Sequence, residues 1–246
     1  YAFGVYATAG TGDVSVTNAD GGEIGFYSYS GRGWGVFAYA NNGDVNVTND
    51  GTISGYAYAQ SAGIFGLAGQ GDVNVTNTGS IEVITGGNAA VGVFARADYG
   101  TASVDNSGDI YASVDGINGF VGDVAYGILA RGEYADVSNS GNIEVHGLYY
   151  GTGIAASSYY GSTVTNTGGS IYVYALGGAT GIDAQSPFGD VTVVNASDIT
   201  AVGLYYGAIG INANSVYGDT HVANSGDIYA ASIYGAATGV YALGEG

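Results

Sequence analysis

Short runs in which apolar and polar residues alternate occur along the whole chain. In the run 44–49, Val45, Val47 and Asn49 share one parity, and polar residues take the other. Gly, Asn and Ser separate the runs, as expected at turns. Alternation with period two places successive side chains on opposite faces of a strand, so the Val side faces a core. The pattern therefore predicts an all-β protein without helices.

A phrase of Gly, then Val or Ile, then any residue, then Ala or once Gly recurs along the chain. Its copies begin at Gly4, Gly35, Gly63, Gly92, Gly127, Gly153, Gly181, Gly210 and Gly239. The mean spacing is about 29 residues, which lies in the range of solenoid repeats. We therefore expect residues 1–246 to form a single solenoid.

Two further phrases follow in each repeat. The second ends on Asn, at Asn18, Asn49, Asn77, Asn106, Asn139, Asn166, Asn195 and Asn224. The third opens on Ile, at Ile24, Ile53, Ile81, Ile110, Ile143, Ile171, Ile199 and Ile228. Three strands per repeat predict a parallel β-helix of about eight coils, each of about 30 residues. The strong handedness of parallel crossovers favours a right-handed one.

The recurring Asn shares the parity of the buried Val residues, which places it inside the turn. Stacked Asn side chains can donate hydrogen bonds along the axis and to the turn backbone. We therefore expect the eight Asn residues to form a structural ladder in the interior.

Composition narrows the range of functions. Hydrophobic residues make up 46% of the chain, enough for a core, and the formal net charge is -18. So acidic a surface repels nucleic acid, whose phosphates require clustered Lys or Arg. The absence of Cys removes disulfides, thiolate metal sites and cysteine nucleophiles. No apolar stretch approaches the roughly 20 residues of a membrane-spanning helix, and no motif indicates a cofactor or a metal.

Neither end of the chain resembles a cap. Residues 1–3 and 240–243 continue the repeat, whereas a terminal coil without a cap leaves backbone groups and core uncovered. We expect either a fragment of a longer repeat chain or copies that stack end to end.

An aromatic column is expected on the outside of the first strand. It comprises Tyr6, Phe37, Phe65 and Phe94, with Tyr39 one step further along its strand. A contiguous apolar patch is unusual on a solvated surface. It predicts a surface for binding or assembly, unless a neighbouring loop covers it.

Other outward positions carry Tyr and Asp. Third-strand positions hold Tyr56, Tyr58, Tyr111, Tyr172, Tyr174 and Tyr229, which can stabilise a sheet by stacking alone. Outward Asp13, Asp44 and Asp72 are expected in one carboxylate column, and Asp190 and Asp219 in another. Such columns fit either a solvated acidic face or calcium, although the turns of calcium-loading repeats are absent.

The few basic residues give little indication of a catalytic site. Arg96 and Arg131 occupy matching positions in adjacent coils, near Asp98 and Glu133. The ordinary interpretation is an exposed ion pair; the alternative is a carbohydrate-binding or carbohydrate-active site, because β-helices resemble polysaccharide lyases. His146 and His221 lie at outward positions without an evident partner. We expect no catalytic residues.

Three phrases carry a family resemblance: VTNTGSI at 75–81, VDNSGDI at 104–110 and VANSGDI at 222–228. They resemble the β-helical passenger repeats of autotransporter adhesins and of haemagglutinin-like type V secreted proteins, and the resemblance spans nearly the whole chain. It implies export, folding outside the cell and often adhesive or self-associating surfaces. Lack of Cys and a single Pro fit such a route.

Together these features predict a non-enzymatic structural and adhesive β-helix, extracellular or at a cell surface, which acts as a stalk or filament segment. Its expected partners are other copies of itself, associating end to end or laterally, or cell-surface glycans.

Overall fold

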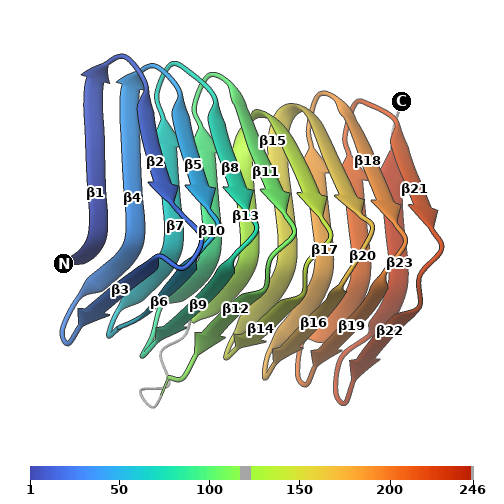
Figure 1. Cartoon of the computed structure of the whole chain (residues 1–246). Helices are drawn as coiled ribbons and strands as arrows, with labels where there is room; N and C mark the ends of the chain where they lie inside the picture. Colours follow the sequence, from blue (N-terminus) through green and yellow to red (C-terminus); the bar gives the residue numbers. More distant parts are fainter. Residues whose placement is uncertain (117–122, 245–246) are drawn as a thin grey trace.

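The computed structural model describes residues 1–116 and 123–244, and these form a β-solenoid of parallel strands (Figure 1). No helix that could span a membrane is found among these residues. Three lines of strands wind around the axis, which confirms the predicted three-stranded parallel β-helix. The alternating pattern of the sequence allows the three lines to enclose a core, because each strand turns one face inward and leaves the other in solvent.

The strands of each line lie side by side along the axis. The first line comprises β1 (Ala2–Thr11), β4 (Arg32–Asn42), β7 (Gln60–Ala68), β10 (Ala89–Ala97), β13 (Val124–Asn139), β15 (Tyr150–Asn166), β17 (Gly178–Ser186), β20 (Gly207–Ser215) and β23 (Ala237–Gly244). The second comprises β2 (Val14–Asn18), β5 (Val45–Asn49), β8 (Val73–Asn77), β11 (Thr101–Asn106), β18 (Asp190–Asn195) and β21 (Thr220–Asn224). The third comprises β3 (Glu23–Ser28), β6 (Thr52–Ala57), β9 (Ser80–Thr85), β12 (Ile110–Val114), β14 (Ile143–Gly147), β16 (Ser170–Ala175), β19 (Asp198–Gly203) and β22 (Ile228–Ser232).

Two strands depart from this scheme. β13 and β15 run without a break from the first line into the second, so these lines join into one 15-stranded sheet, and the third line forms an 8-stranded sheet. Every pairing is parallel, and equivalent residues pair with one another, as Ile81 does with Ile53 and Ile110.

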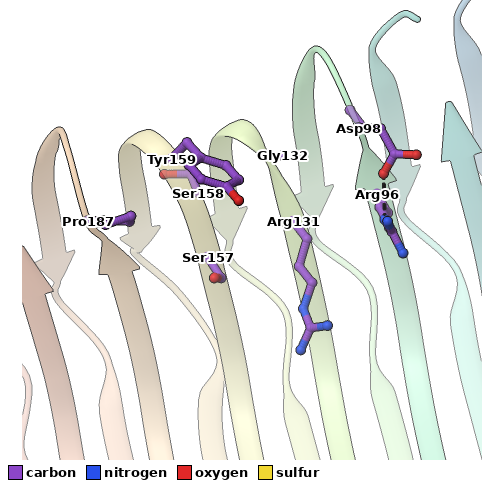
Figure 2. A pocket seen from close by; sticks show the side chains of 9 residues that line it. Arg96, Asp98, Arg131, Gly132, Ser157, Ser158, Tyr159 and Pro187 are labelled. Atoms are coloured by element: carbon purple, nitrogen blue, oxygen red, sulfur yellow. Dashed lines mark hydrogen bonds and ion pairs between the residues drawn. The ribbon is translucent and has the colours of Figure 1, made fainter. Parts of the chain in front are cut away.

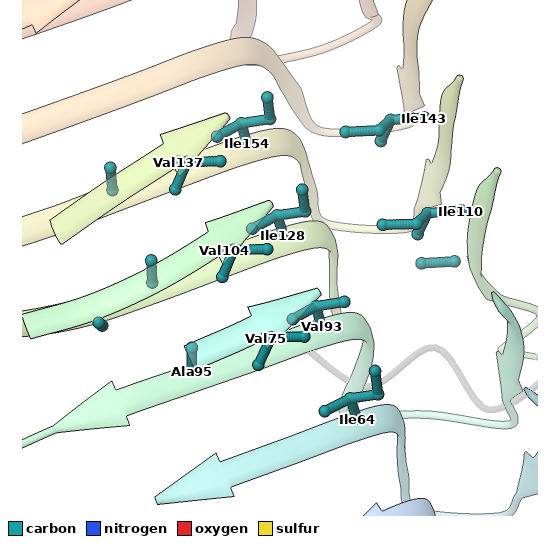
Figure 3. Packing of buried hydrophobic residues seen from close by; sticks show 14 of the residues in the cluster. Ile64, Val75, Val93, Ala95, Val104, Ile110, Ile128, Val137, Ile143 and Ile154 are labelled. Carbon is teal, nitrogen blue, oxygen red and sulfur yellow. The ribbon is translucent and has the colours of Figure 1, made fainter. Parts of the chain in front are cut away.

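The core is a continuous column of aliphatic side chains. Figure 3 shows Ile64, Val93, Ile128 and Ile154 stacked from coil to coil, with the second and third lines facing them. The recurrent Ile of the third line is buried in coils two to seven, from Ile53 to Ile199. Because each side chain stacks on the equivalent residue of the next coil, the same core packing recurs in every coil.

The recurrent Gly marks a corner of the coil. A Cβ built on Gly92 would collide with Cγ2 of Ile110 and would lie 2.6 Å from the carbonyl oxygen of Gly127 in the next coil. The same two obstacles recur at Gly35, Gly63, Gly127, Gly153, Gly181 and Gly210. Gly is thus required where the first strand turns against the third.

The predicted Asn ladder is present. Each Asn side chain donates a hydrogen bond from Nδ2 to Oδ1 of the next Asn, across 2.6–2.8 Å, in an unbroken series from Asn18 to Asn224. Most of them also donate to a turn carbonyl, as Asn106 does to Gly108 at 2.9 Å. The ladder satisfies polar groups that the narrow interior would otherwise leave without partners.

Candidate functional site

The outer face of the first strand line carries the predicted aromatic column. Tyr6, Phe37, Phe65 and Phe94 pair in register, and Tyr39 lies in the adjacent column. Successive ring centroids are 5.2, 5.4 and 4.7 Å apart, with interplanar angles of 5°, 9° and 23°. The ring faces are therefore occupied by one another, and the ring edges face outward.

A second outward column lies beside this one, which the alternation did not predict. Trp34, Ala62 and Val91 share the parity of the buried Val36, yet they pack outside the core, against the Phe column. The cause is the corner: Gly35 and Val36 both face inward, so Trp34 and Phe37 both face outward, with ring centroids 5.8 Å apart. The outside of this bend is concave, and it leaves Trp34 only 7% exposed.

We call Tyr6, Trp34, Phe37, Tyr39, Phe65 and Phe94 the aromatic face. Exposure falls inward from the first coil: Tyr6 is 60% exposed, whereas Phe37, Phe65 and Phe94 are half-buried. The cluster continues into Leu129, which pairs in register with Phe94 and is 6% exposed. Leu129 is outward but buried, because neighbouring outward side chains cover it in the concave bend.

First-line strands alone build this cluster within the described residues, so the expectation of a covering loop gains no support from them. Carboxylates are missing from its columns until β17, where Asp183 follows Ala155 in register. All three Arg residues of the chain also lie on first-line strands, at positions 32, 96 and 131. In a molecule of net charge -18, this face is apolar and locally basic.

Of the two predicted Arg–carboxylate pairs, Arg96 with Asp98 and Arg131 with Glu133, only the first forms an ion pair. Arg96 and Arg131 pair in register, as expected, and Nε of Arg96 donates to Oδ1 of Asp98 at 2.7 Å. No such bond joins Arg131 to Glu133, because a register irregularity between Gly132 and Tyr134 displaces the residues that follow Arg131. Of the ion pairs that the described residues form, none involves Arg131.

A cavity of about 460 Å³ opens beside this Arg pair, where the strands of four successive coils turn (Figure 2). Its walls carry Arg96, Arg131, Ser157, Tyr159 and Pro187. Partial burial raises the pKa of Tyr126, further back on β13, while the positive charge of Arg131 acts in the opposite direction. Asp98, paired with Arg96, also lines the cavity, which therefore combines a carboxylate and two guanidinium groups with hydroxyl and apolar surface.

The acidic columns have a structural role. Oδ1 of Asp13, Asp44 and Asp72 each accepts a backbone N–H from the next coil, at 2.8–2.9 Å. Asp190 does the same for Asp219 at 2.9 Å. Within the described ranges, no group of three or more His, Asp or Glu side chains is placed to hold a metal ion. These bonds give the Asp side chains a role in joining one coil to the next.

The expectation that His146 lacks a partner was wrong. Its Nε2 lies 2.7 Å from Oε1 of Glu144, and its ring contacts Tyr111, Tyr172 and Tyr174. The alternation of the strand was a signal for this contact, because Glu144 and His146 are two residues apart on β14 and so share its outward face. His221 lies on β21, in register with Thr192.

The tyrosines of the third line are outward but interrupted. Tyr56 stacks on Tyr27 at 5.6 Å, and then Ile84 takes its column in the next coil. Tyr111, Tyr172 and Tyr229 belong to a second column, separated by Glu144 and Thr200. Tyr58 lies just beyond the end of β6. These short stacks fit a role in stabilising the sheet.

No protein-family model, curated protein or solved structure matches this chain. Function is therefore inferred from the faces that the coils present.

Proposed function

We propose that this chain is a non-enzymatic structural segment, a stalk or filament element of an extracellular surface protein, that associates laterally with a second copy through its aromatic face. The observation that carries this proposal is the aromatic face itself: a contiguous, concave apolar strip in which Tyr6 is 60% exposed and Phe37, Phe65 and Phe94 stay partly exposed, while Phe3 stacks on the buried Trp34. Contiguous apolar patches of this kind mark association surfaces.

The geometry favours a protein partner over a sugar on this face. Sugars bind aromatic side chains through the ring faces, but here the faces of Phe37, Phe65 and Phe94 stack against each other. Ring edges and the concave bend offer shape and apolar area instead, and these suit side chains of another chain. The absence of carboxylates from these columns until Asp183 allows two copies to approach here.

The location is proposed from the repeat phrases, which resemble those of exported β-helical adhesins. A continuous stack of parallel strands supplies the stiffness that a stalk needs, since each coil contacts only its neighbours along one axis. The remaining surface is strongly acidic, which keeps copies apart elsewhere.

Sedimentation velocity over a range of concentrations tests the proposal. The wild-type chain is expected to dimerise, and more strongly at high salt, because screening weakens the repulsion between two chains of charge -18. The double variant Phe37→Ser, Phe65→Ser is expected to raise the dissociation constant by about 1,000-fold, because both chains of the dimer lose two rings and each ring contributes roughly 1 kcal/mol of burial.

The matched control is Phe188→Ser, Tyr217→Ser. These two rings stack at 5.7 Å in an exposed column elsewhere, and their removal should leave dimerisation unchanged. Far-UV circular dichroism verifies that both variants keep the β-helix. A wild-type chain that stays monomeric at every concentration and salt, or an equal loss in the control, would contradict lateral association through the aromatic face.

A further inference from the structure

The cavity beside Arg131 differs in chemistry from the aromatic face. Arg96 and Arg131 stand on adjacent strands, which lie about 4.8 Å apart in a parallel sheet. Figure 2 shows Asp98 paired with Arg96, while the Arg131 side chain extends along β13, and no carboxylate of the described residues forms an ion pair with it. Two cations in register repel each other unless an anion lies close to both. Arg131 thus offers an unused positive charge inside a hollow of the surface.

The remaining walls supply a hydroxyl and two apolar surfaces. Ser157 is exposed on β15, in register with Arg131. Tyr159 is 60% exposed and is the first ring of a stacked column that continues through Phe188 to Tyr217. The Phe188 ring lies parallel to the Tyr159 ring at a centroid distance of 6.5 Å, and the Tyr160 ring is tilted against it at 6.3 Å, so part of the Tyr159 ring stays open. Pro187 adds apolar surface from the following coil.

The geometry points to a binding site for an acidic saccharide, with a sugar carboxylate held by Arg131 and a sugar ring packed on Tyr159. A guanidinium matches a carboxylate through two parallel N–H donors, and it does so better than an ammonium group. An exposed aromatic ring next to polar groups suits a sugar ring, which is apolar on one side. The cavity of about 460 Å³ falls within the usual range for small-ligand sites. The site requires no catalysis, and it is independent of the lateral association proposed above.

Isothermal titration calorimetry with a galacturonate trisaccharide tests the site, at low and at moderate salt. We expect saturable 1:1 binding that weakens as salt rises. Arg131→Gln should weaken binding at least about 10-fold, the scale of a lost charge-assisted bidentate bond. Tyr159→Ser should also weaken it, and so should methyl esterification of the sugar carboxylates.

The matched control is Arg32→Gln. Arg32 is an exposed Arg on β4, paired in register with Gln60 and remote from the cavity, and its loss changes the net charge by the same amount. Its variant should bind within about twofold of wild type. Equal losses in the two Arg variants would reduce the interaction to general electrostatics and overturn the site.

Two other outcomes would also overturn it. One is the absence of wild-type binding at about 10 mM saccharide, a concentration that detects even weak ligands. The other is binding of inorganic sulfate as tight as that of the trisaccharide, which would identify a small-anion site without a saccharide. Binding that persists in the Phe37→Ser, Phe65→Ser variant would separate this site from the aromatic face.

Discussion

Replacement of one Asn in the middle of the ladder should lower the free energy of unfolding substantially. Asn106 is fully buried; its Oδ1 accepts from Asn77 at 2.7 Å, and its Nδ2 donates to Asn139 at 2.7 Å and to Gly108 at 2.9 Å. Asn106→Ala removes all three bonds. Asn77 retains a donation to Gly79 at 3.2 Å, but Oδ1 of Asn139 loses its ladder donor.

The expected loss of stability follows from the stranded groups. A buried donor or acceptor left without a partner costs about 1–3 kcal/mol. Asn106→Ala strands one N–H of Asn77, the Oδ1 of Asn139 and the Gly108 carbonyl, and it leaves a small void. We expect the free energy of unfolding to fall by about 3–5 kcal/mol, a large part of the stability of a typical domain.

Equilibrium unfolding in urea measures this loss, followed by circular dichroism. The matched control is Asn74→Ala, which removes an exposed Asn whose Nδ2 donates to Asn46 at 3.1 Å on the outside of the two preceding coils. The control should cost less than about 0.5 kcal/mol, as surface substitutions usually do. If the free energies of unfolding of the two variants lie within about 1 kcal/mol of each other, the buried ladder does not stabilise the fold more than an exposed Asn pair does.

Two further outcomes are expected. Gly92→Ala should destabilise the chain strongly or prevent folding, since its Cβ would meet the carbonyl oxygen of Gly127, whereas Gly25→Ala, with open space around its Cβ, should be neutral or slightly stabilising in the same urea assay. Burial raises the pKa of Tyr126 above the ordinary value of about 10 for a tyrosine, so the unfolded chain loses this proton first and the free energy of unfolding should fall as the pH rises above about 10. In the Tyr126→Phe variant the free energy of unfolding should fall less steeply over this pH range. An identical slope in both proteins would show that Tyr126 does not contribute to the pH dependence.

The interior was predictable because each inward position repeats. Asn, Ile and Gly return at a fixed place in every coil, and parallel stacking sets each one on its own copy, as with Ile81 between Ile53 and Ile110. A single repeat thus predicts the core of all of them. The Phe column was predictable for the same reason, because it keeps a constant distance from the repeated Gly.

The missed features all depart from strict alternation. Trp34 follows the parity of the core, and only the corner at Gly35 turns it outward. Arg131 loses contact with Glu133 through a register irregularity that no motif indicates. The Asp columns bond to backbone groups of the next coil, whose position depends on the stacking itself. The recurrent Gly was the one available signal, since a Gly kept in every coil indicates a bend.

This division between inside and outside has a functional consequence. The inward residues are fixed by the ladder and the corner, but the outward columns change freely, from Phe94 through Leu129 and Ala155 to Asp183 in successive coils. The same β-helix can therefore present chemically different surface patches at fixed distances along its axis. Phe65 of β7 and Arg131 of β13 are two coils apart, about 10 Å at the spacing of parallel strands. A protein partner on the aromatic face and an acidic sugar at Arg131 would thus lie next to each other along one edge of the molecule.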